Sequence, residues 1–187
     1  MNQEDIWTGS YYDLSIEFPL ETKPHQLKDS LSSATQLKEF SLSILDEPLS
    51  PGELVYLQGS LGEFPCMLSV MVVEGEATWL DFSIPVQLFE KRYDVIYPLT
   101  VDKNRWLMEI NELYIALAQT IYNSLPFQLA MIGEEVAGMT TSTTIDIATS
   151  KTMSTILPPS LQDKLQLETT GETLSNNLRF YLPIEGE

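Results

Sequence analysis

The chain has 187 residues, 43% of them hydrophobic and 20% charged, so it is long enough and apolar enough to form one domain around a packed core. Acidic residues outnumber basic ones 27 to 10, giving a net charge of −17 that is spread along the whole sequence. This charge repels phosphate backbones, so we expect no nucleic acid partner; it would attract a basic protein instead.

The first ten residues, MNQEDIWTGS, contain two acids and no apolar stretch, unlike a secretory signal or a transit peptide. The apolar run at 66–73 is far shorter than the roughly 20 residues that a membrane-spanning helix requires. The lone Cys66 excludes an intramolecular disulfide and suits a reducing compartment. We therefore expect a cytoplasmic protein that does not enter a membrane.

Two patterns open the chain. Residues 11–18, YYDLSIEF, alternate apolar and polar side chains, which predicts a half-buried strand. Apolar residues then recur every three or four positions from Leu27 to Phe40, which predicts an amphipathic helix over 27–40. The prolines and glycine of 45–53 interrupt regular structure.

The next segment favours strands. Residues 53–97 are rich in β-branched and aromatic side chains and are broken repeatedly by glycine and proline, which predicts an antiparallel meander. Within it, EGE at 74–76 fits a hairpin connection between two apolar runs.

A long apolar stripe then predicts a helix over 102–125, with Asp102 as its N-cap and Pro126 as its stop. The apolar face is wider than a surface helix needs. We expect this helix to pack across the sheet as the central packing element.

The C-terminal third is less regular. It predicts a strand ending in GEEVAG, a short alternating strand at 143–149, a helix capped by Ser160, and a hairpin turning near 171–177. Residues 139–160 are rich in Ser and Thr, which suits either a strand or a mobile segment.

Most catalytic and metal chemistry is excluded by composition. One histidine and one cysteine cannot build a Cys/His zinc cluster, and no segment has the ligand spacing of a calcium loop. GSLGEF at 59–64 lacks the Lys and Ser/Thr of a phosphate-binding loop. His25 has no neighbouring Ser or Asp motif for a triad, and Cys66 lies among apolar residues as a buried hydrophobe would. We expect no metal and no cofactor.

Carboxylates remain the candidates. Glu134 and Glu135 are adjacent between glycines. Neighbouring side chains of an extended chain point to opposite faces, so these two carboxylates would not converge on one ligand. We therefore interpret the two glutamates as a polar turn at the end of a strand. Asp81 lies two residues from Trp79, and an aromatic neighbour can alter the pKa of a carboxyl. Glu134, Glu135, Trp79 and Asp81 are therefore the candidate interaction or ligand site.

Together these features predict an α+β protein whose mostly antiparallel sheet is packed by two amphipathic helices, at 27–40 and 102–125. We favour a non-catalytic protein-interaction module, with an immunity- or antitoxin-like inhibitor of a basic partner as one version. The alternative is a carboxylate-based enzyme or small-ligand binder with a pocket between helix and sheet. A homo-oligomer is a third option.

Overall fold

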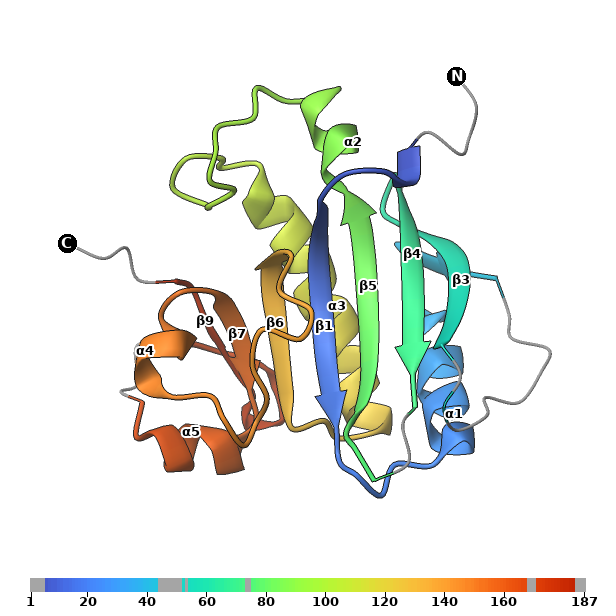
Figure 1. Cartoon of the computed structure of the whole chain (residues 1–187), viewed down its shortest axis with the longest axis vertical. Helices are drawn as coiled ribbons and strands as arrows, with labels where there is room; N and C mark the ends of the chain where they lie inside the picture. Colours follow the sequence, from blue (N-terminus) through green and yellow to red (C-terminus); the bar gives the residue numbers. More distant parts are fainter. Residues whose placement is uncertain (1–5, 44–51, 53, 73–74, 168–170, 184–187) are drawn as a thin grey trace.

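The computed structural model describes residues 6–43, 52, 54–72, 75–167 and 171–183. Within them the chain forms an α+β fold with one nine-stranded antiparallel sheet in the order β2-β3-β4-β5-β1-β6-β7-β9-β8 (Figure 1). The predicted fold class is confirmed. The strands are β1 (Tyr11–Phe18), β2 (Phe40–Leu42), β3 (Leu54–Leu61), β4 (Phe64–Met71), β5 (Thr78–Pro85), β6 (Leu129–Glu134), β7 (Ser154–Leu157), β8 (Glu172–Thr173) and β9 (Arg179–Tyr181); the helices are α1 (Pro24–Ala34), α2 (Val86–Glu90), α3 (Leu107–Ser124), α4 (Ile147–Ser150), α5 (Pro159–Leu165) and the 3₁₀ turn η2 (Ser175–Asn177).

Strand β1 is central. It pairs along its full length with β5 and on its other side with β6. The predicted period of two is confirmed, because Leu14 and Ile16 face the main core while Asp13 and Ser15 face the opposite side of the sheet. The polar side chains are as buried as the apolar ones, however, which alternation alone does not predict.

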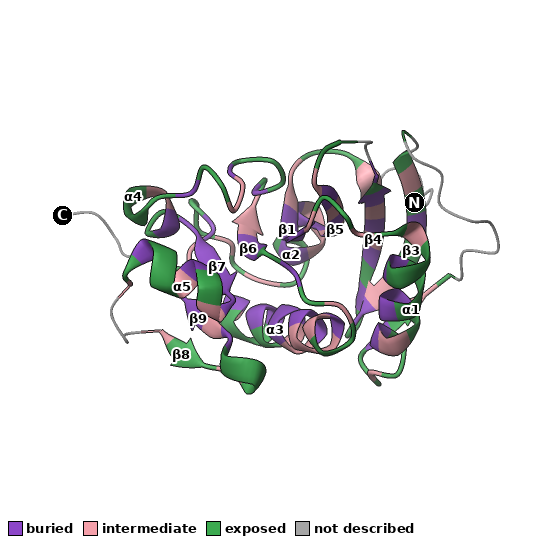
Figure 2. Cartoon of the chain, turned by 90° about the horizontal axis from the view of Figure 1, so that it is seen from below, coloured by how far each residue is buried: buried purple, intermediate pink, exposed green. Residues whose placement is uncertain are grey.

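Helices α1 and α3 contact each other and cover one face of the sheet (Figure 2). The predicted central helix is confirmed, and Tyr114 at its middle is fully buried. Its hydroxyl lies 2.7 Å from the carbonyl oxygen of Tyr12 and 3.0 Å from that of Phe82, so α3 is tied to the two central strands.

The helix limits differ from those predicted. Asp102 is not the N-cap, because the chain before α3 is held in turns by Asn104, whose side chain accepts from the amide and donates to the carbonyl of Ile96 at 2.8 and 2.6 Å. Helix α1 begins at Pro24, where proline suits the first turn, and it ends before Phe40 enters β2.

The meander is confirmed for β3, β4 and β5, which pair in sequence. It does not extend to residue 97: the chain turns into α2 at Val86, because Phe89 is buried in the core from a helical turn. Of the predicted EGE connection at 74–76, residue 74 lies outside the described residues.

The C-terminal segment covers part of the opposite face. Apolar residues of α5 and of the chain before α4 pack on β6, β7 and β9 in a second cluster: Leu129, Met131, Val136, Ile145, Met153, Leu157, Leu161, Leu165 and Tyr181. The layer reaches past β6 to β1, where Ser142 bonds Glu17, and to β5, where Trp79 packs against the cluster, so this end of the sheet is covered on both faces (Figure 1).

Two predictions here are wrong. Residues 143–149 form a hydrogen-bonded turn and then α4, because the carboxylate of Asp146 accepts from the amide of Thr149 at 2.7 Å and caps that helix. Ser160 lies inside α5, since Pro158 is the N-cap and Pro159 supplies the first turn. The hairpin near 171–177 is confirmed as β8 and β9. Whether 139–160 is mobile stays a prediction.

Candidate functional site

The face of β1, β5, β4 and β3 that points away from α1 and α3 is hereafter the open face, and Figure 1 looks onto it. The strand register places its side chains in three rows. From β1 to β3 these rows are Ser15, Asp81, Ser69 and Tyr56; Glu17, Trp79, Met71 and Leu54; and Asp13, Ser83, Met67 and Gln58.

Asp81 lies at the middle of this face. Its Oδ1 accepts a hydrogen bond from the Ser15 hydroxyl at 2.5 Å, and its Oδ2 accepts one from the Ser69 hydroxyl at 3.3 Å. Burial raises the pKa of Asp81, and the two hydroxyls only partly offset that effect. The carboxylate is therefore held by neutral partners on both neighbouring strands.

Asp13 is the second carboxyl of the open face. It is 3% exposed, and its Oδ1 has no hydrogen-bond partner among the described residues. Burial raises the pKa of Asp13 to about 7; the nearby charges of Asp81 and Glu135 add to the rise and a hydrogen bond with Ser83 opposes it. Near neutral pH this carboxyl is consequently close to its midpoint of ionisation.

Glu17 has a structural task. Its carboxylate accepts from the amide of Ser142 at 2.5 Å and from the hydroxyl of the same residue at 3.0 Å, so it fastens the segment after β6 across the edge of the open face. Burial raises the pKa of Glu17, against the two Ser142 bonds and the charge of Lys164. Lys164 itself donates to the carbonyl oxygen of Ser142 at 2.8 Å.

Large apolar side chains lie beside the carboxylates. Tyr56 is 59% exposed, Leu54 47% and Met71 39%, and the register places them together across β3 and β4. Exposed apolar groups clustered next to polar ones are typical of protein interaction surfaces. The strands β1, β3, β4 and β5 contain no Lys, Arg or His, so they supply no cation to this face.

The structure separates the four residues that the sequence singled out. Trp79 and Asp81 lie on the open face, away from α1 and α3, so the predicted pocket between helix and sheet is wrong for Asp81. Glu134 pairs with Tyr12 and lines a cavity of about 220 Å³ whose walls include Ile132 of the main core and Met153 of the second cluster. Glu135 turns with a φ of 53°, and its Oε1 accepts from the amide of Tyr11 at 2.9 Å. The two glutamates diverge, as the turn interpretation requires.

Sequence reasoning missed Asp13, Ser15 and Ser69. The signal for Asp13 and Ser15 was present in YYDLSIEF, which places its polar side chains on one face of a strand, whereas Ser69 lies among apolar residues in FPCMLSVM and had no such signal. What the sequence lacked was the pairing of β1 with β5, which aligns this face with that of Asp81.

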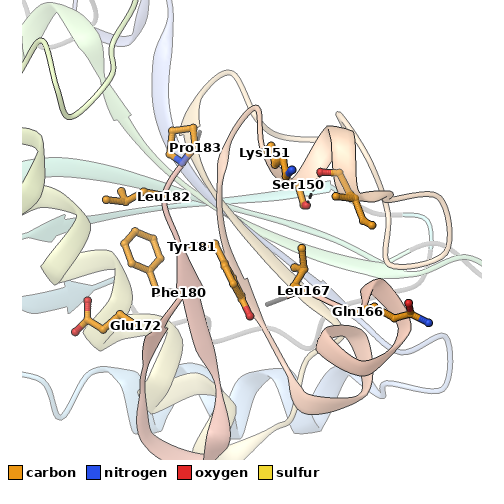
Figure 3. Close-up of a pocket in the computed structure, with 10 residues that line it drawn as sticks. Ser150, Lys151, Gln166, Leu167, Glu172, Phe180, Tyr181, Leu182 and Pro183 are labelled. Carbon is orange, nitrogen blue, oxygen red and sulfur yellow. Dashed lines mark hydrogen bonds between the residues drawn. The ribbon is translucent and has the colours of Figure 1, made fainter. Parts of the chain in front are cut away.

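A cavity of about 600 Å³ lies between α4, the end of α5 and β9 (Figure 3). Lys151 and Glu172 are its charged lining residues, and the buried hydroxyl of Tyr181 has no hydrogen-bond partner among the described residues. In the same described part, no group of three His, Cys, Asp or Glu is arranged to hold a metal ion. No helix there has the length and hydropathy to cross a bilayer.

Fold and site together define an α+β protein with a half-covered antiparallel sheet whose open face carries buried carboxylates beside exposed apolar groups. No protein-family model and no curated protein matches the chain. A solved structure of a Pseudomonas aeruginosa T6SS protein is similar over 95% of this chain and 71% of its own, at 10% identity and a TM-score of 0.40. A likeness of that strength carries no functional argument.

Proposed function

We propose that this chain is a non-catalytic protein-interaction module that binds a basic protein through the open face. The observation that carries the proposal is that Asp13 and Asp81 share one face of strands without a single basic residue, that Asp81 is held by neutral hydroxyls, and that Tyr56 and Met71 are exposed on the same face. A basic partner supplies the missing cation, and the apolar side chains supply area to bury.

The net charge of −17 also favours a basic protein as the partner. A field of this sign accelerates encounter with a cationic protein, and salt weakens that attraction. An immunity- or antitoxin-like inhibitor is the concrete version, in which the chain suppresses the activity of its partner at equimolar ratio. We place the module in the cytoplasm, in keeping with a lone buried Cys66.

The test is affinity capture with the full chain as bait, followed by purification of the captured protein and measurement of its Kd. The open-face variant D81N/Y56A is compared with the control M108A/E112Q, which makes the same charge change and removes an exposed apolar group on α3. We expect a basic partner that binds wild type and control alike, binds the open-face variant more weakly, and dissociates between about 0.1 and 1 M salt, where the Debye length falls from about 10 to 3 Å. A partner whose Kd changes neither with salt nor with the open-face variant refutes the proposal.

A small-ligand binder is the second candidate, and the cavity beside β9 favours it, because about 600 Å³ is within the range of ligand pockets. Filling the cavity with Ile147→Trp would then abolish any ligand-induced rise in Tm, while the exposed-residue control M108A would keep it. A ligand whose effect survives Ile147→Trp does not bind there. Light scattering of the same samples tests the homo-oligomer.

A further inference from the structure

The open face has an anionic centre that the protein itself does not neutralise. The groups that act on the Asp81 carboxyl are the hydroxyls of Ser15 and Ser69, and those that act on Asp13 are Ser83 and two further acids, Asp81 and Glu135. Asp13 is only 3% exposed, and its Oδ1 has no hydrogen-bond partner among the described residues. Asp81 is less buried than Asp13, and its hydrogen-bond partners are two neutral hydroxyls, so a cation from a partner can reach its carboxylate.

The geometry at Asp81 suits a planar donor. Ser15, Asp81 and Ser69 stand opposite one another on three adjacent strands, so two hydroxyl oxygens flank one carboxylate in a row across the sheet. A guanidinium offers five N–H donors in one plane and can satisfy several acceptors in such a row, whereas an ammonium offers three donors from a point charge.

Aromatic neighbours favour the same group. Trp79 is two residues from Asp81 on the same face of β5, and Tyr56 ends the row that contains Asp81 on β3. Guanidinium planes stack on aromatic faces, and Trp and Tyr with Arg are the residue types that dominate binding energy at protein interfaces.

We propose that Asp81 is the anchor of the open face and takes an arginine side chain of the basic partner, with Ser69 as an additional acceptor and with Tyr56 and the half-buried Trp79 beside the guanidinium. Ser15 is fully buried, so it orients the Asp81 carboxylate by its hydrogen bond and does not contact the partner. This inference rests on the proposed function and specifies the chemistry of its partner. Asp13 lies in the neighbouring row of the same face and is too buried to contact the partner.

The first experiment uses the purified partner and isothermal titration calorimetry with wild type, D81N and the matched control E112Q on α3. We expect D81N to weaken binding by about 10- to 100-fold, the range for a lost hydrogen bond to a charged group, and E112Q to leave it unchanged. Replacing the responsible partner arginine by lysine should cost nearly as much, and that replacement should add little in the D81N background. If the partner binds all three chains equally, Asp81 is not the anchor although the proposed function survives.

The second experiment needs neither partner nor variant. N-acetyl-arginine amide and N-acetyl-lysine amide are titrated at equal ionic strength into ¹⁵N-labelled wild-type protein. We expect amide shifts centred on Ser15, Asp81 and Ser69 that are larger for the arginine probe. Equal shifts with both probes, shifts scattered over the acidic surface, or no shifts overturn the inference, and they do so independently of whether a protein partner has been found.

Discussion

Removing the ionisable group of Asp13 should change how stability depends on pH. Asp13→Asn keeps the shape of the side chain but cannot ionise. In the wild type, burial and neighbouring acids raise the pKa of Asp13 to about 7 from the ordinary 3.8. The folded chain therefore binds more protons than the unfolded chain between these two values, and its stability falls as pH rises through that window.

The size follows from the two pKa values. Together they correspond to a loss of about 4 kcal/mol over the complete window, at about 1.36 kcal/mol for each pKa unit. Between about pH 5 and about pH 8 the loss is roughly 2 to 3 kcal/mol. Because Asp13→Asn lacks this loss, its stability relative to wild type should improve by that amount over the same interval.

Urea unfolding followed by circular dichroism at a series of pH values measures the difference. The control is Asp29→Asn, which removes an equal charge from an exposed position of α1. The change between pH values is the quantity of interest, because any fixed cost of the new amide cancels from it. If wild type and Asp13→Asn keep a constant stability difference from pH 5 to 8, the carboxyl is not held in the protonated form by burial, and the reasoning is wrong.

Three further results are expected. Tyr114→Phe removes a buried hydroxyl that reaches two strand carbonyls, so it should cost about 1 to 2 kcal/mol in urea unfolding, and an unchanged midpoint would contradict the tie between α3 and the sheet. Gly59→Ala places a Cβ against the backbone of Ser41, so β2 must move; faster amide exchange confined to β2 and β3 would show it, and unchanged exchange would refute it. The Cys66 thiol is buried, which raises its pKa to about 12, so it should resist a thiol reagent in native buffer and react on unfolding; rapid native labelling would contradict this burial.

Local patterns identified most elements of the fold. The alternation of β1 and the long stripe of α3 are signals that repeat over many residues, and both held because they reflect one face packed against a core. Predictions failed where a few residues decided the outcome. Asp146 could begin a helix or sit in an alternating strand, and the local sequence gives no means to choose between capping and pairing.

The candidate site likewise combines features that the sequence determines with features that only the tertiary structure determines. The sequence by itself determined the acidic charge, the shortage of metal and nucleophile chemistry, and the turn that separates Glu134 from Glu135, because each depends on composition or on neighbouring residues. Only the tertiary structure decided that Asp13 and Asp81 share a face. Residues 68 positions apart meet there because β1 inserts between β5 and β6, and strand order is set by long-range packing that no local pattern records.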